Sequence, residues 1–277
     1  MKTKEKTPTL DLVAVFLEIW KRYDSIFLDF EAARSKDLGR KRAEPKKIFR
    51  GIMHILWTGG SWRSLPRTFG ARSTVHDYFL EWTQAGLFEK LWKTIALDAD
   101  EEGAIDSHLQ MIDGTHILTV YMPPDVAGFS YKHKNKRGMK VSLLIDGRGI
   151  PISIEIGPAN THDSQLLEET LSHSVIEEVE PEEKVLLGDS GYIGEEQEFV
   201  AEDYGFQHNF RPRHGQIQDY PKKKLKESRK NRWMVERSIS WIKNMRRIRS
   251  CYEKSLESFR GFVQLSCAYV VFRKCFV

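Results

Sequence analysis

The stretch KVSLLIDGRGIPISIEI, residues 140–156, decides the fold class of this chain. Its two halves, Lys140–Asp146 and Ile150–Ile156, are apolar, rich in β-branched residues and of the length usual for strands. The turn Asp146–Gly149 that joins them is typical of a β-hairpin. We therefore predict two antiparallel strands, and we assign Asp146 to the turn rather than to a catalytic site.

The segments on both sides of this hairpin extend the pattern into one sheet. Leu109–Asp113 is predicted to be a strand that ends in an acid, and Lys184–Leu187 a short buried strand that leads to Asp189. Helices are predicted over residues 162–173 and 195–203, with a further strand near residues 206–210. A basic loop over residues 221–230 and two C-terminal helices are predicted to follow. Three antiparallel strands followed by alternating helices and strands predict an α/β layer with one mixed central sheet.

The first hundred residues are predicted to be helical. Leu10–Tyr23 and Ile48–Trp57 carry apolar residues at helical spacing. Residues 99–107 form an acidic stretch with little periodicity, which is typical of a linker. We therefore divide the chain into an all-α domain over residues 1–98, this linker, and an α/β domain over residues 108–277.

Residues 61–85 are the part of the helical domain best suited to contact DNA. Ser61 can cap a helix over Trp62–Phe69, and Ser73 can cap a second helix over Thr74–Gln84. Two short helices joined by a tight turn are typical of a helix-turn-helix whose second helix enters a DNA groove, although an ordinary helical hairpin has the same pattern. The candidate DNA contacts of this segment are Arg63, Arg67, Arg72, His76 and Tyr78.

Composition excludes a membrane protein and a secreted disulfide scaffold. Hydrophobic residues make up 40% and charged residues 30% of the 277 residues, and the longest apolar run, Gly261–Phe272, is too short to cross a bilayer. The lysine-rich N-terminus has no secretion signal, so we expect a cytoplasmic protein. Three cysteines form an odd set without the spacing of a zinc site, and we assign them no chemistry.

Positive charge is concentrated in one segment near the C-terminus. Arg211–Arg249 contains 14 Lys and Arg against three Asp and Glu, although the whole chain carries a net charge of only +4. Trp233 and Trp241 are interleaved with these cations, and Glu236 lies among them. A basic segment with interleaved aromatic residues indicates nucleic acid as the partner.

Within that segment, Arg232, Glu236 and Lys243 share one face of a predicted helix, because the offsets of four and 11 residues return to nearly the same direction at about 100° per residue. One carboxylate in a stripe of cations is suited to a metal and a phosphate group. The candidate phosphate contacts are Arg229, Arg232, Lys243, Arg246 and Arg247.

The candidate catalytic residues and metal ligands are Asp113, Asp189 and Glu236. Each aspartate ends a predicted strand, and the helix that carries Glu236 could pack across those ends. Three converging carboxylates need divalent cations, and hard oxygen ligands suit Mg²⁺, with Mn²⁺ as a substitute. Two such ions about 4 Å apart would serve the in-line displacement of a phosphodiester.

Each of these acids also fits a structural role when it is taken alone. The two aspartates could be turn residues, and Glu236 could pair with Arg232 on its own helix. His116, His162 and Asp163 lie close in sequence to the strand ends, but their spacing matches no zinc pattern. We assign these three to supporting or structural roles.

Taken together, the motifs resemble those of the DDE transposases of bacterial insertion sequences, in the branch founded on insertion sequence five. The resemblance covers nearly the whole chain. Its motifs are Trp57–Pro66 in the helical region and Asp113–Thr115, Gly157–Ser164, Gly188–Tyr192 and Arg232–Arg237 in the second half.

The resemblance implies an RNase H-like catalytic domain preceded by an all-α, helix-turn-helix-like DNA-binding domain. It implies that Asp113, Asp189 and Glu236 hold two Mg²⁺ ions, and that the protein cleaves DNA at terminal inverted repeats and transfers the strand into target DNA. A homodimer on double-stranded DNA, associated with the bacterial nucleoid, is the expected assembly. The family signature has a tyrosine where this chain has Arg229, so we infer no hairpin intermediate.

Two other functions fit the same features. A catalytically silent DNA-binding regulator derived from a transposase would keep the basic surface but would have no need of three acids. A structure-selective RNase H-like nuclease would use the acids without regard to terminal sequence.

Overall fold

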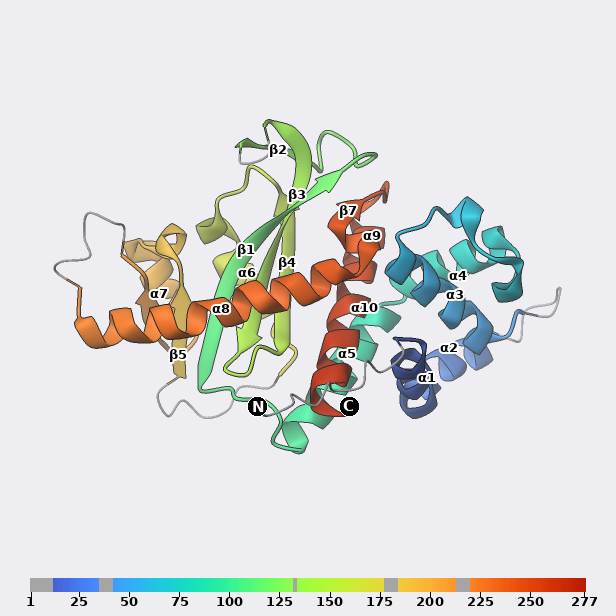
Figure 1. Ribbon diagram of the computed structural model, residues 1–277, viewed down its shortest axis with the longest axis horizontal. Coiled ribbons are helices and arrows are strands. Elements are labelled where there is room, and N and C mark those ends of the chain that lie inside the picture. The colour runs from blue at the N-terminus through green and yellow to red at the C-terminus, as the bar shows by residue number, and fades with distance from the viewer. Residues whose placement is uncertain (1–11, 35–41, 132–133, 177–183, 213–219) are drawn as a thin grey trace, which may run out of the picture.

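The computed structural model describes residues 12–34, 42–131, 134–176, 184–212 and 220–277 (Figure 1). The N-terminal region is helical, as predicted, and lies beside the sheet rather than within it. Its helices are α1 (Leu12–Tyr23), α2 (Ser25–Arg34), α3 (Pro45–Thr58), α4 (Arg72–Gln84) and α5 (Leu87–Glu101).

Residues 62–69 differ from the single helix that we predicted. They form two 3-10 turns, η1 (Trp62–Ser64) and η2 (Arg67–Phe69), because Pro66 lacks an N–H and its ring cannot continue a helix. Ser61 caps η1 as predicted, with its hydroxyl oxygen accepting from the backbone N–H of Ser64. Ser73, the predicted cap of the next helix, instead lies inside α4.

One mixed sheet forms the centre of the second half, as predicted. Strands β4 (Pro151–Pro158), β3 (Lys136–Asp146) and β1 (Leu109–Thr119) are antiparallel neighbours. Strands β5 (Lys184–Gly188) and then β6 (Phe206–Phe210) continue the sheet from β1 in parallel. This order and these directions are those of an RNase H-like fold. The other strands are β2 (Gly128–Ser130) and β7 (Ser250–Cys251).

The hairpin between β3 and β4 forms where the sequence predicts it, and Asp146 is its organising residue. One carboxylate oxygen accepts from the backbone N–H groups of Arg148 (3.0 Å) and Ile150 (2.6 Å), and the other from that of Asp106 (2.8 Å). Gly149 has a φ of +87°, which favours glycine at this position. Asp146 therefore has the turn role assigned to it.

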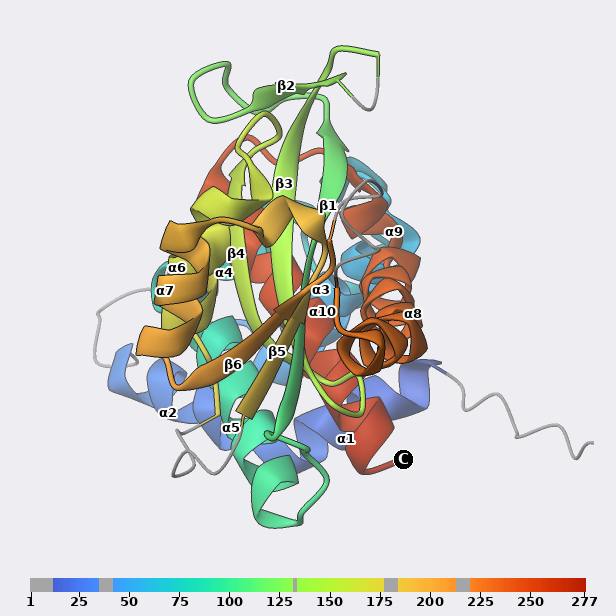
Figure 2. The same cartoon turned by 90° about the vertical axis from the view of Figure 1, so that its left-hand side faces the viewer.

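Helices cover both faces of the sheet. Figure 2 shows α8 (Lys222–Asn244) on one side, and α6 (Leu167–Ser172) and α7 (Glu195–Asp203) on the other. The helix α8 begins at Lys222, whereas we predicted a basic loop through residue 230. The remaining elements are η4 (Asp163–Leu166), η5 (Ser190–Tyr192), α9 (Arg246–Arg249) and α10 (Leu256–Cys275).

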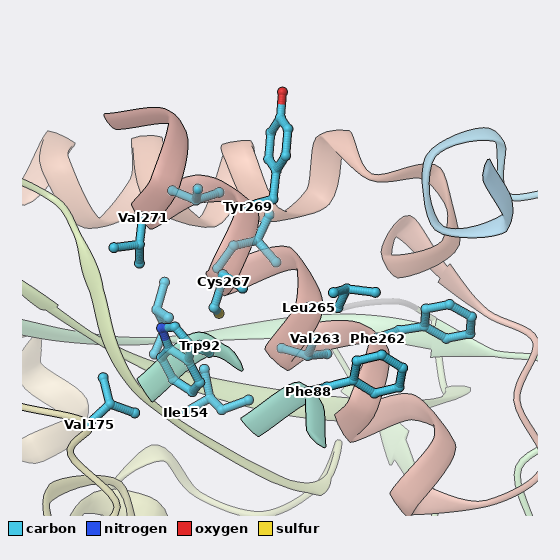
Figure 3. Close-up of a cluster of buried hydrophobic side chains, with 14 of the residues drawn as sticks. Phe88, Trp92, Ile154, Val175, Phe262, Val263, Leu265, Cys267, Tyr269 and Val271 are labelled. Carbon is cyan, nitrogen blue, oxygen red and sulfur yellow. The ribbon is translucent and has the colours of Figure 1, made fainter. Parts of the chain in front are cut away.

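The last helix, α10, joins the helical region to the sheet. Its residues 258–272 include a nearly unbroken series of buried side chains, because α10 packs on α5, on α1 and on β4. Figure 3 shows Phe88 of α5 packed with Phe262 and Val263 of α10, and Trp92 of α5 beside Ile154 of β4. Trp92 also donates to the carbonyl of Pro151 (3.2 Å). The apolar run over residues 261–272 is thus a core helix.

The expected linker begins inside a helix. Helix α5 continues to Glu101, so the predicted boundary at residue 98 falls within its last turn. A single hydrophobic cluster extends from α1 through α5 and α10 to the sheet. Among the described residues, no helix is both long enough and apolar enough to cross a membrane.

Candidate active site

Asp113 lies inside β1, which continues to Thr119 instead of ending at this acid as predicted, and Asp189 directly follows the adjacent parallel strand β5. Met111 of β1 pairs with Leu187 of β5, so the residues two places further along each strand stand side by side. Because side chains alternate with a period of two, both aspartates point to the same side of the sheet. Arg232 of α8 lines the same small pocket, whose volume is about 20 Å³.

The two aspartates interact electrostatically. Burial and then the like charge of Asp189 raise the pKa of Asp113 to about 6, against the lowering effects of the Gly114 N–H and of Arg232. One carboxylate oxygen of Asp113 accepts from the Gly114 N–H (2.8 Å), and one of Asp189 accepts from the Gly191 N–H (2.7 Å). These contacts aim both carboxylates at the pocket while leaving oxygens for a further ligand.

Asp163 is a third acid beside this pair, and we had assigned it only a supporting role. Its carboxylate forms an ion pair with the buried Lys140 of β3 (2.9 Å) and raises the pKa of Asp113. A Cβ on Gly114 would lie 2.1 Å from an oxygen of Asp163, so only glycine permits this approach. His162 caps η4, the short helix that begins with Asp163.

Glu236 approaches the site from α8 but is not in contact with the two aspartates. Its carboxylate accepts from Nε of Arg232 (3.1 Å), and its side chain is 58% exposed. Within the described part of the chain, no three acidic, histidine or cysteine side chains are grouped closely enough to hold a metal ion. The structure thus brings Asp113 and Asp189 together in one pocket and leaves Glu236 paired with Arg232, outside the lining of that pocket.

Lys243 fixes α8 on the sheet instead of facing solvent. Its ammonium donates to the hydroxyl of Thr115 (2.6 Å) and to the carbonyl of His116 (3.3 Å), both on β1 just beyond Asp113. Burial, and then the charge of Arg249, lower the pKa of Lys243. The predicted phosphate contact is therefore already bonded to the strand that carries the first acid.

The other predicted DNA contacts divide by exposure. Arg63, Arg67, Arg72 and Arg246 are exposed, and His76 is half-buried against the ring of Trp62. The side chain of Arg229 lies outside the described part of the structure.

Two of the predicted DNA contacts are wrong because their side chains belong to the core. Tyr78 packs against Trp82 and donates to the carbonyl of Ala43 (3.3 Å). Arg247 is 5% exposed and forms an ion pair with the buried Glu253. Helical spacing placed both residues on a face, but packing turned that face inward.

The individual known proteins that this chain resembles are distant from it in sequence. The solved structure of a pre-cleavage Mos1 transpososome aligns with 90% of this chain and 86% of that chain, at 11% identity and a TM-score of 0.29. The insertion element IS402 uncharacterized 16.2 kDa protein of Burkholderia cepacia is 26% identical over 105 residues, which are 37% of this chain and 71% of that protein.

Two family models cover most of the chain. Residues 18–92 match the model of a putative transposase of the IS4/5 family. Residues 101–271, more than half of the chain, match the transposase DDE domain. The chain therefore belongs to the DDE transposases of the IS4/5 type.

Proposed function

We propose that this transposase binds the terminal inverted repeats of its insertion sequence, hydrolyses the phosphodiester at each end, and joins the freed 3′-hydroxyl to target DNA. The observation that carries the proposal is the placement of Asp113 beside Asp189, under a helix that brings Arg232 to the same pocket. Paired carboxylates next to a guanidinium suit a reaction in which a metal-bound phosphate is attacked.

The donor set fits a divalent cation at the aspartate pair. The raised pKa of Asp113 reflects a like-charge repulsion that a bound cation would offset. The pocket of about 20 Å³ has room for a water-sized species. Carboxylate oxygens in small number favour Mg²⁺, with Mn²⁺ as a substitute. Two bound ions would supply the charge that stabilises the attacking and leaving oxygens.

Glu236 is the third ligand in this proposal, and its ion pair with Arg232 supplies a way to recruit it. A guanidinium can bind two phosphate oxygens through a pair of parallel hydrogen bonds, just as it can bind the two oxygens of a carboxylate. When Arg232 binds a DNA phosphate, Glu236 loses its ion-pair partner, and its side chain can turn toward the two aspartates. The exchange costs little, since an exposed ion pair is worth only about 0–1 kcal/mol.

Lys243 and Asp163 hold the surrounding elements while this exchange takes place. The bonds from Lys243 to β1 keep α8 at a fixed place over the strand that carries Asp113. The ion pair between Asp163 and Lys140 balances one of the negative charges near the aspartates. Both contacts therefore act through the position and the charge of the site.

The DNA-binding surface in this proposal is made by exposed cations of both halves. Arg63, Arg67 and Arg72 lie in the region of the turns η1 and η2 and of α4, where a terminal repeat would be read. The basic segment that contains α8 adds affinity for phosphates of any sequence, which falls steeply with salt. Because transposition joins two ends, a homodimer on DNA is the assembly that we propose.

A plasmid cleavage assay tests the proposal. A supercoiled plasmid that carries the element's two ends should be cut at those ends in the presence of Mg²⁺ or Mn²⁺ and should stay intact with a chelator. Asp113→Ala and Glu236→Ala should abolish cutting while retaining DNA binding, whereas Asp203→Ala, which removes an exposed acid of α7, should cut normally.

The same assay separates the alternatives. Binding without cutting by the wild-type protein would indicate a silent regulator. Equal cutting of cognate and scrambled ends would indicate a structure-selective nuclease. Normal cutting by Asp113→Ala would refute the assignment of the site.

A further inference from the structure

We propose that a cavity between α3, the junction of α8 with α9, and α10 binds an unpaired nucleotide of a DNA strand, with cations on its phosphates and Trp57 against its base. The cavity has a volume of about 530 Å³, within the roughly 300–1,000 Å³ that is usual for ligand pockets. The proposal rests on the proposed function, because it assigns a further DNA site on a transposase.

The side chains that line the cavity include four cations and no acid. The four cations are Arg246, Arg249, Arg273 and Lys274. In the part of the chain that the structure describes, none of these four cations forms an ion pair with a carboxylate. The pKa of Lys274 is lowered by burial and then by the charges of Arg237 and Arg273, so the cations repel one another. An anion bound here would relieve that repulsion.

The ring of Trp241 holds one of these cations, Lys274, in place without neutralising it. The ammonium of Lys274 lies 4.2 Å from the centre of the Trp241 ring, and the guanidinium of Arg237 lies 4.5 Å from it. A cation on the face of a tryptophan is attracted to the ring but keeps its full charge. Trp241 therefore leaves the charge of Lys274 available to a ligand, whereas a carboxylate in its place would cancel that charge.

Trp57 is the aromatic residue that we assign to stack on the base. It lies in the last turn of α3, lines the cavity and is 38% exposed. The end of α3 is held against α9, because a Cβ on Gly59 would lie 2.9 Å from Cβ of Arg246. Trp57 and Arg246 are thus fixed relative to each other before any ligand binds.

These features favour an unpaired nucleotide over duplex DNA. A duplex presents phosphates outside and keeps its bases stacked inside, so it could meet the cations but not lay a base on Trp57. Along α8, Trp241 is nine residues from Arg232, about 13 Å at 1.5 Å per residue, or roughly four nucleotides of a strand at 3.4 Å each. A strand end frayed beside the active site would therefore reach the cavity.

The test compares two duplexes of equal phosphate number, one blunt and one with a short single-stranded extension, both of a sequence unrelated to any terminal repeat. Binding is measured by fluorescence anisotropy with a chelator present, so that cleavage plays no part. Wild-type protein should bind the extended duplex about tenfold more tightly than the blunt one, the size expected for one base on an aromatic ring. A fluorescent base analogue in the extension should be quenched on binding.

Three variants and a control define the outcome. Trp57→Ala should lose the preference for the extended duplex, and Trp57→Phe should keep most of it. The double variant Arg273→Gln/Lys274→Gln should bind both duplexes more weakly and lower the salt slope by about two. Lys93→Gln, which removes an exposed cation of α5, should match the wild-type protein.

Thermal unfolding of each variant shows that the fold is kept. The proposal is overturned if wild-type protein has no preference for the extension, or if Trp57→Ala keeps the preference. If Arg273→Gln/Lys274→Gln binds DNA more weakly while Trp57→Ala keeps the preference for the extended duplex, the cavity contacts only the phosphates of duplex DNA. Loss of Mg²⁺-dependent cutting at the ends would instead affect the proposed function, which the plasmid assay measures separately.

Discussion

Replacing Arg247 by methionine is expected to cost the folded protein about 3–5 kcal/mol, because its partner Glu253 is buried with it and would keep an unpaired charge. Nε of Arg247 donates to Glu253 (2.7 Å), and Nη1 donates to the carbonyl of Gly60 (3.1 Å) in the loop after α3. At about 2–4 °C per kcal/mol for a chain somewhat shorter than this one, the melting temperature should fall by about 6–20 °C.

Two comparisons isolate this effect. The double variant Arg247→Met/Glu253→Leu removes both charges and should regain most of the loss, since a buried ion pair and an apolar pair are close in stability. Lys93→Met breaks an exposed ion pair with Glu89 on α5 and should change stability by about 0.5 kcal/mol or less. Urea and thermal unfolding, with an unchanged dependence on denaturant, measure all three.

Arg246 supplies the contrasting case, because it is exposed and lines the cationic cavity. Arg246→Gln should have the same free energy of unfolding as the wild-type protein but should bind DNA more weakly. Arg247→Met, measured well below its melting temperature, should bind DNA like the wild-type protein. The opposite result, normal stability and weak DNA binding in Arg247→Met, would refute the structural role assigned to this residue.

Two further substitutions test the acids of the sheet. The pKa of Asp113 is raised to about 6 in the folded protein, so the folded state favours the protonated carboxyl. This contribution to the free energy of unfolding is fully present below about pH 4 and is lost as the pH rises through about 6. Asp113→Asn should therefore be more stable than the wild-type protein at about pH 8, by up to about 3 kcal/mol. Mg²⁺ should reduce this difference in stability. Equal urea midpoints of the two proteins at that pH would contradict the prediction. Asp146→Ala leaves three backbone N–H groups without their acceptor and should cost about 3–6 kcal/mol, whereas a loss below about 1 kcal/mol in urea would show that the hairpin turn does not depend on it.

Local sequence predicts those features that depend on neighbours along the chain. The hairpin over residues 140–156 forms as expected, because alternation and turn residues act within a few positions. The short strand before Asp189 could be found in the same way, but the predicted end of the first strand at Asp113 is wrong, because β1 continues to Thr119 by pairing with β3. The prediction of one helix over residues 62–69 is wrong, although Pro66 in the sequence indicates the break between the two turns. Helix α8 begins earlier than predicted, because lysine is a good helix former.

Other features depend on contacts between distant parts of the chain. The strands β2 and β7 are too short to carry a pattern and exist only through pairing with β3 and β1. Asp163 reaches the aspartate pair because Gly114 lets η4 approach β1. No spacing in the sequence measures that distance.

The sequence alone determined the family, the order of most elements and which strands bring the two aspartates to the site, because those are properties of short stretches. Tertiary structure alone decided which side of each helix is buried. Tyr78 and Arg247 face the core while Arg246 faces the cavity, and Glu236 pairs with Arg232 rather than with the two aspartates. Helical periodicity defines a face, but only packing against α10 and the sheet determines whether that face meets protein or solvent.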